Sequence, residues 1–116
     1  MKGLIIKKPW VDYILKGDKI WEIRGSKTKV RGKIELIQSG SGLVVGCCEI
    51  IDCFQLSLEE YKQNVNNHCV TNTDKLPYNQ TYAWVIKNPT RYEQPRRYKH
   101  PNGAIIWVNL DKNDKR

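Results

Sequence analysis

The sequence lacks any apolar run long enough to cross a membrane as a helix. Its apolar runs, such as residues 43–45 and 105–108, fall far short of the roughly 20 residues that a membrane helix requires. The first residues also lack the apolar stretch and small-residue cleavage site of a secretory signal, because Lys7 and Lys8 follow almost at once. These absences predict a cytoplasmic protein with no membrane partner.

Cysteine pairs with the spacing of zinc ligands are absent as well. The four cysteines form no C-x-x-C pair, and His68 beside Cys69 lacks the usual ligand spacing. Cys47 and Cys48 are adjacent in an expected strand, so their side chains should point to opposite faces. A free cysteine is commonly a small buried hydrophobic residue. We therefore expect no metal site and no cofactor.

The chain of 116 residues contains no internal repeat, no inter-domain linker and no regular series of crossover helices. Its length is that of one domain, and the missing crossover helices argue against a parallel α/β sheet. We expect a single domain over residues 1–110 and a frayed basic tail over residues 111–116. No feature of the sequence signals an oligomer, so a monomer is favoured.

Positive charge is concentrated at the two ends of the chain. Residues 1–33 contain ten Lys/Arg and three Asp/Glu, and residues 87–116 contain eight and three, whereas residues 34–86 contain two and six. A fold that brings the ends together would create one basic face. Such a face suits a polyanion, because neutralising phosphates releases counterions. The alternative is that these lysines and arginines only keep the protein soluble.

Short strands and two short helices are predicted along the chain. Pro9 suits the first turn of a helix that ends at Gly17, and Ser57 with Glu60 forms a capping box that opens the second. Asn88-Pro89 is expected to end a strand. We expect residues 64–80 to form a loop and residues 90–102 to form an extended basic segment. The expected strands are 3–7, 20–24, 33–38, 43–54, 81–87 and 104–110. This pattern predicts an α+β, mainly β protein, a small mixed or antiparallel β-barrel with two or three short peripheral helices.

The segment from Lys19 to Arg24 carries the strongest candidate site. If it is a strand, Glu22 and Arg24 share one face, while Trp21 and Ile23 share the other and belong to the core. With Lys19 at the rim, the first face would present a carboxylate between two cations, which suits phosphates or a base edge. The alternative is a solvated ion-pair ladder that contributes little energy.

Aromatic and histidine residues have separate expected roles. Trp84 and Trp107 are typical core residues of such strands, whereas Trp10 at a helix start is the tryptophan most suited to a cleft. His68 in the polar loop and His100 in the basic segment are expected on the surface rather than in catalysis.

A basic segment near the C-terminus is a second candidate surface. Arg91, Arg96 and Arg97 alternate with Tyr92 and Tyr98, which could line a groove and stack on bases. A basic edge strand that discourages aggregation explains the same pattern.

The sequence resembles the ASCH domain, named for activating signal cointegrator-1 homology, over about residues 3–110. Gly17, Lys19, Glu22 and Arg24 fit the family's G-x-K-x-x-E-x-R signature. The other matching segments are Leu4-Ile5-Ile6-Lys7-Lys8-Pro9-Trp10, Arg31-Gly32-Lys33-Ile34, Val45-Gly46-Cys47-Cys48-Glu49-Ile50-Ile51-Asp52-Cys53, Trp84-Val85-Ile86-Lys87-Asn88-Pro89 and Ile106-Trp107.

The resemblance implies a PUA-like barrel with a cleft beside the Pro-Trp helix, and RNA as partner, with DNA possible. Lys8 stands where many relatives carry Gln, which adds charge and removes any base contact by that amide. Combining the resemblance with the basic segment, the expected nucleic-acid contacts are Lys7, Lys8, Pro9, Trp10, Lys19, Glu22, Arg24, Arg91, Arg96 and Arg97.

The resemblance also implies an enzymatic alternative. Some small relatives hydrolyse N4-acetylcytidine with a Thr nucleophile where this chain has Glu22, and another relative is linked to RNA cleavage. A carboxylate cannot simply replace that hydroxyl, and Lys19 beside Glu22 should stay protonated and be a poor base. If the protein is an enzyme, Lys19 and Glu22 are the expected catalytic residues. A third reading is a protein-interaction module whose basic face meets an acidic partner.

Overall fold

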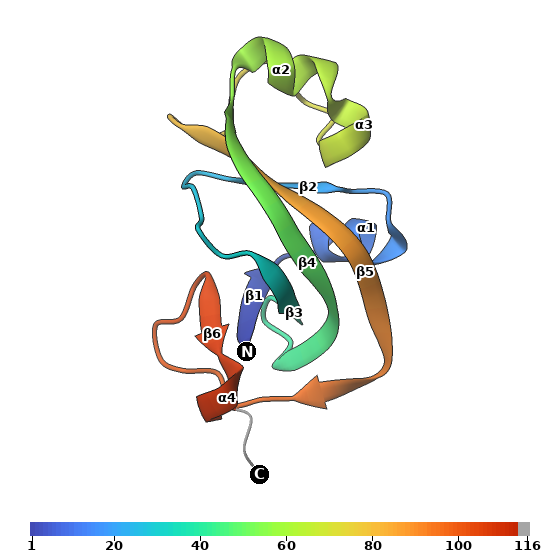
Figure 1. Cartoon of the computed structure of the whole chain (residues 1–116), viewed down its shortest axis with the longest axis vertical. Helices are drawn as coiled ribbons and strands as arrows, with labels where there is room; N and C mark the ends of the chain where they lie inside the picture. The colour runs from blue at the N-terminus through green and yellow to red at the C-terminus, as the bar shows by residue number, and fades with distance from the viewer. Residues whose placement is uncertain (114–116) are drawn as a thin grey trace.

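The computed structural model describes residues 1–113, which form a six-stranded sheet and four short helices (Figure 1). The strands are β1 (Lys2–Ile6), β2 (Trp21–Arg24), β3 (Gly32–Gln38), β4 (Leu43–Leu56), β5 (Thr81–Arg97) and β6 (Trp107–Asn109). The helices are α1 (Trp10–Lys16), α2 (Leu58–Gln63), α3 (Val65–His68) and α4 (Leu110–Asn113). The strand order is β2-β5-β4-β3-β1-β6, and β1 with β3 is the parallel pair. The predicted mainly β class with peripheral helices is confirmed.

β5 is ten residues longer than the predicted strand 81–87, whereas β4 is only two residues longer than the predicted strand 43–54. β4 and β5 form a curved antiparallel ribbon that runs through the length of the molecule, with α2 and α3 at one end (Figure 1). The prediction that Asn88-Pro89 ends a strand was wrong, because β5 continues through both residues. The register explains this: Lys87 pairs with Glu49 and Thr90 with Cys47, so Asn88 and Pro89 lie at a bulge. A bulge tolerates proline because its N–H is not needed by the ladder.

Gly46 lies at a second irregularity of the same ribbon. A Cβ atom there would stand 2.3 Å from the Thr90 carbonyl oxygen and 2.6 Å from the Leu15 side chain. Only glycine therefore allows β5 and α1 to approach β4 this closely.

The C-terminal part differs from the prediction in length. β6 covers Trp107–Asn109 only, and it pairs with β1. Asp111–Asn113 belong to α4 rather than to an unstructured tail, whereas residues 114–116 of the predicted tail lie outside the described part of the chain.

Helices α1 and α2 begin and end where the sequence signals predict. Gly17 ends α1 in the left-handed conformation, with a φ of 88°. Ser57 and Glu60 form both hydrogen bonds of the capping box of α2. The loop expected over residues 64–80 was wrong at its start, because Val65–His68 form α3.

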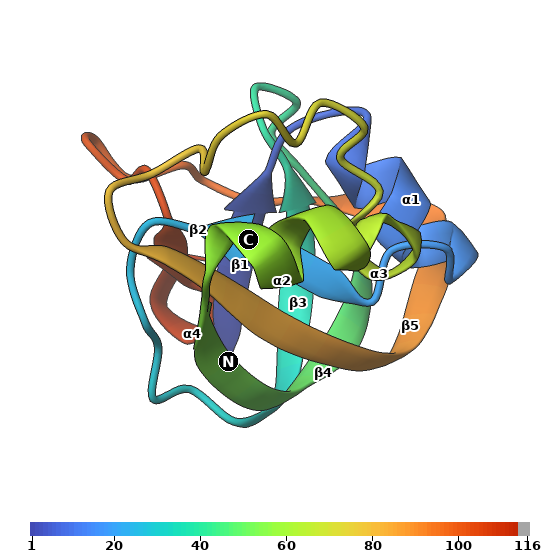
Figure 2. The same ribbon diagram turned by 90° about the horizontal axis from the view of Figure 1, so that it is seen from above.

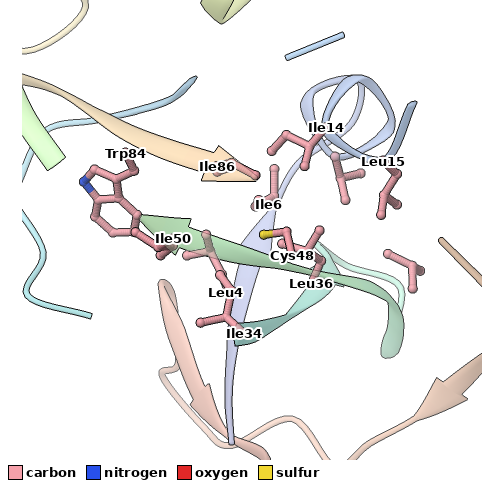
Figure 3. Packing of buried hydrophobic residues seen from close by; sticks show 12 residues of the cluster. Leu4, Ile6, Ile14, Leu15, Ile34, Leu36, Cys48, Ile50, Trp84 and Ile86 are labelled. Carbon is pink, nitrogen blue, oxygen red and sulfur yellow. The ribbon is translucent and has the colours of Figure 1, made fainter. Parts of the chain in front are cut away.

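Three apolar clusters hold these elements together. The largest lies between the sheet and α1, where Ile14 and Leu15 face Ile6 and Cys48 (Figure 3). The second lies around Ile37 and contains residues of β1, β6 and the segment after β5. The third joins α2 and the loop after α3 to β2, β4 and β5, and its half-buried members include Trp21 and Ile23. As predicted, Trp84 is fully buried, and it stacks on the half-buried Trp107.

The sheet curls strongly, and α2 and α3 lie across one of its ends (Figure 2). Within residues 1–113, no strand pairing joins the edge strands β2 and β6, so the barrel-like sheet is not closed. A side chain bridges part of this gap, because the Arg24 guanidinium of β2 donates to the Ile5 carbonyl of β1 at 2.8 Å. None of the helices over the same residues is long and apolar enough to span a membrane.

Candidate functional site

A cavity of about 810 Å³ lies where Arg24 bridges β2 and β1. Its size is that of a site for a small organic ligand or a nucleotide. Its wall comes from β1, β2, the start of α1, α2 and the segments that connect the elements. The lining residues are Ile5, Lys7, Trp10, Lys19, Glu22, Ile23, Arg24, Ser39, Gly40, Gly42, Tyr61, Val70, Pro77, Tyr78, Tyr98, His100, Ala104 and Ile105.

Lys19 is the most deeply buried charged residue of this wall, with 2% of its surface exposed. Its ammonium group donates to the His68 carbonyl at 2.5 Å and lies 3.9 Å from Glu22 Oε1. It also lies 5.0 Å from the centre of the Trp10 ring, within the range of a cation–π contact. The prediction that Lys19 lies at the rim was therefore wrong: the α3 backbone covers it.

Glu22 and Arg24 project together, as the strand alternation predicts. Arg24 Nε donates to Glu22 Oε2 at 2.8 Å, and the guanidinium lies 5.5 Å from the centre of the Trp84 ring. Only 7% of the Glu22 side chain is exposed. The alternative of a solvated ion-pair ladder is thereby excluded, because the cluster is buried.

The electrostatics of Lys19 differ from those expected from the sequence. Burial lowers the pKa of its ammonium group below the ordinary value of 10.5, and the Glu22 carboxylate opposes part of that shift. The expectation that Glu22 simply keeps Lys19 protonated considered only the second effect. A lysine in this environment loses its proton more readily than a lysine on the surface.

His68 supports the cluster from behind, and the prediction that it lies on the surface was wrong. It is fully buried and stacks on the Tyr61 ring, with centroids 4.5 Å apart. Nε2 donates to the Tyr61 carbonyl and Nδ1 accepts from the Val70 N–H, which defines one neutral tautomer. Burial lowers the pKa of His68, the nearby Lys19 adds to that effect, and the Tyr61 hydrogen bond opposes it.

Tyr98, which the sequence suggested as a base-stacking residue, also lines the cavity, together with His100, Tyr78 and Ile105, which the sequence did not suggest. Tyr98 donates its hydroxyl hydrogen to His100 Nδ1 at 2.7 Å, since His100 Nε2 donates to the Ala104 carbonyl. Tyr78 and Ile105 are exposed at the wall, with 47% and 78% of their surface accessible. Tyr78 and Ile105 stand out through the exposure of their side chains in the folded chain, and the sequence carries no signal for this exposure.

The structure divides the ten predicted contact residues into two groups. The cavity is lined by Lys7, Trp10, Lys19, Glu22 and Arg24 and not by Lys8, Pro9, Arg91, Arg96 and Arg97. Lys8 and Pro9 are exposed beside it. The three arginines lie on the second half of β5. Arg91 forms an ion pair with Asp12 of α1, with 3.2 Å between the guanidinium and the carboxylate.

Comparison with known proteins gives a family and a fold. The ASCH domain profile matches residues 4–96. Among solved structures, the chain is similar to the ASCH protein of Zymomonas mobilis, with a TM-score of 0.65 and 10% identity over 78% of this chain and 68% of that one. A mutant form of that protein gives a TM-score of 0.69 and 10% identity over 83% of this chain and 74% of that one. No curated protein matches this sequence.

Proposed function

Since the chain belongs to the ASCH domain family, we propose that it is an RNA-binding module whose cavity takes up one nucleotide. The observation that carries this proposal is the buried Lys19–Glu22–Arg24 cluster in the wall of the cavity. Burying three charged groups costs free energy that a purely structural core would avoid with apolar residues. Such a cost is typical of sites that exist for a ligand. We expect the protein to act as a monomer in the cytoplasm.

The cluster suits the hydrogen-bonding edge of a base. Glu22 Oε2 is occupied by Arg24, whereas Oε1 lies 3.9 Å from the Lys19 ammonium, beyond hydrogen-bond distance. Oε1 therefore keeps acceptor capacity for an N–H group of a ligand, as a carboxylate does for the amino group of cytosine. The Trp10 ring beside it offers a surface on which a base can stack.

RNA is favoured over DNA because a base can enter such a cavity only when it is unpaired and unstacked, as bases in RNA loops are. Sequence-specific RNA recognition usually targets loops and bulges, whose bases are already unstacked. A base in duplex DNA would first have to be flipped, at a cost of a few kcal/mol. The exposed Lys7 and Lys8 beside the cavity add attraction for the phosphate backbone.

A fluorescence-anisotropy titration of a labelled stem-loop RNA and its DNA counterpart tests this function. We expect RNA to bind more tightly than DNA, and the affinity to fall as salt rises, because phosphate contacts release counterions. Absence of binding to both molecules at low salt would contradict the proposal. Binding that favours an acidic protein over RNA would support an interaction module instead.

A hydrolase is the second candidate, and the lowered pKa of Lys19 favours it. A lysine that loses its proton readily beside a carboxylate is a candidate for acid–base chemistry. Hydrolysis of N4-acetylcytidine would consume water and give cytidine and acetate. Mass spectrometry of free N4-acetylcytidine, and of RNA recovered from the titration, tests this candidate. Unchanged nucleoside and intact RNA after long incubation would contradict it.

A further inference from the structure

One part of the cavity wall is lined by hydrogen-bond donors. Lys7 directly follows β1, and the Ser39–Gly42 loop joins β3 to β4. The Ser39 N–H donates to the Ile6 carbonyl at 2.9 Å, which brings this loop to Lys7. Lys7, Ser39, Gly40 and Gly42 all contribute to the wall.

Several of these donors have no partner within residues 1–113. Lys7 has no carboxylate within ion-pair distance there, and the Ser39 hydroxyl has no hydrogen bond. The backbone N–H groups of Gly40 and Gly42 also lack acceptors in the same part of the chain. Free backbone N–H groups of a glycine-containing turn, with a cation and a hydroxyl beside them, are suited to binding an anion, although the Ser41 N–H between the two glycines is used by the Gln38 carbonyl. Both glycines have a positive φ, 79° and 71°.

The remaining polar groups nearby are already used. The two His100 ring nitrogens are occupied by Tyr98 and Ala104, and the Gly42 carbonyl accepts from the Tyr98 N–H. These bonds hold the wall around Tyr98 and His100 in place. Within the described part of the chain, Lys7 and the Ser39–Gly42 loop therefore keep free donors for an anion, whereas His100 does not.

Glu22 is the acidic residue of the described lining, and Lys19 and Arg24 beside it balance its charge. Lys7 and Gly40 of the same wall are exposed, so that solvent and a continuing chain have access to them. A ligand that reaches both Glu22 and Lys7 has an N–H donor for the carboxylate and a negative charge for the lysine.

We propose that Lys7 and the Ser39–Gly42 loop form a phosphate subsite, so that the ligand is a nucleotide carrying its phosphate rather than a free nucleoside. This inference rests on the proposed function, because it takes the base to lie at Glu22. The base enters first, and the phosphate stays at the exposed Lys7, where an RNA chain can continue.

Isothermal titration calorimetry with nucleosides and nucleotides tests the subsite. The probes are cytidine and adenosine, which carry an exocyclic amino group, and their 5′- and 3′-monophosphates. We expect a monophosphate to bind about tenfold more tightly than its nucleoside, since a hydrogen bond to a charged group contributes that much. The better of the 5′- and 3′-phosphates identifies which linkage of an RNA occupies the subsite.

Lys7 and Lys8 provide a matched pair of variants. Both are exposed and adjacent, but only Lys7 lines the cavity. Lys7→Ala should abolish the advantage of the phosphate and leave nucleoside binding unchanged, whereas Lys8→Ala should preserve the advantage. An equal loss in both variants would overturn the subsite in favour of diffuse attraction.

The outcomes separate this inference from the proposed function. Equal affinities for nucleoside and monophosphate would overturn the phosphate subsite and leave the base site intact. If neither ligand binds, the proposed function fails, and inorganic phosphate then tests the subsite by NMR. Amide shifts at Gly40 and Gly42 that disappear in Lys7→Ala would support an anion site by itself, and unshifted amides would overturn it.

Discussion

Glu22→Leu is expected to lower the free energy of unfolding by about 3–5 kcal/mol, because it leaves two buried cations without their shared carboxylate. Lys19 and Arg24 both lie against Glu22 and have 2% and 16% of their side chains exposed. Chemical denaturation followed by tryptophan fluorescence measures this loss. The matched control is Glu59→Leu on the exposed surface of α2, which should change stability by about 0.5 kcal/mol or less.

The same prediction has a second test in a double variant. Adding Lys19→Met to Glu22→Leu removes one of the unpaired cations, so the double variant should be more stable than Glu22→Leu by at least about 1 kcal/mol. If the double variant instead loses the sum of the stability losses of Glu22→Leu and Lys19→Met, the Glu22 and Lys19 charges do not interact. That result would contradict the description of this cluster as one electrostatic unit.

Lys19→Met is expected to weaken RNA binding about a hundredfold, because a buried, hydrogen-bonded charge at a binding site contributes that order of free energy. Lys19 also fixes the wall, since it joins α3 to Glu22 through the His68 carbonyl. Methionine keeps the length of the side chain and removes its charge. Anisotropy titrations measure the affinity, and circular dichroism checks that the variant is folded.

Lys16→Met is the control for this second prediction. Lys16 is exposed in the last turn of α1 and does not line the cavity. Its substitution by methionine lowers the net charge by the same amount as Lys19→Met does. It should reduce affinity only slightly. Equal losses in Lys16→Met and Lys19→Met would mean that RNA responds to overall charge and that the cavity is not the binding site.

The local part of the site could be predicted from the sequence. The alternation along β2 was sufficient to place Glu22 and Arg24 on one face, and their 2.8 Å contact confirms it. The burial of Lys19 could not be predicted in the same way. It depends on α3, a four-residue helix within a polar segment, which is held in place by the stacking of His68 on Tyr61 of α2.

The long course of β5 illustrates a second limit of sequence reasoning. Asn88-Pro89 is a common end of a strand. Farther along β5, Arg91 pairs with Gly46 and Arg96 pairs with Val44, and residues 92–95, which include Pro95, lie between these two pairs without a partner in the ladder. β5 accommodates both prolines at register irregularities, and the glycine at position 46 makes room for Thr90 and Arg91 between them. Bulges depend on the facing strand, so the sequence of β5 alone does not reveal them.

The basic segment shows why charge alone did not locate the site. Arg91, Arg96 and Arg97 contribute to the positive charge of residues 87–116, but they lie outside the cavity lining. The cavity instead uses Lys7, Lys19 and Arg24 from the first part of the chain. Charge counts along a sequence do not tell which side chains turn toward a cavity and which pair elsewhere, as Arg91 does with Asp12.

Photo-crosslinking tests most directly whether RNA enters the cavity. A stem-loop RNA carrying 4-thiouridine in its loop is irradiated with the protein, and the crosslinked peptides are identified by mass spectrometry. We expect crosslinks to the aromatic residues that line the cavity, Trp10, Tyr78 and Tyr98. Crosslinks confined to residues 91–97, on the second half of β5, would contradict it and place RNA on the basic strand instead.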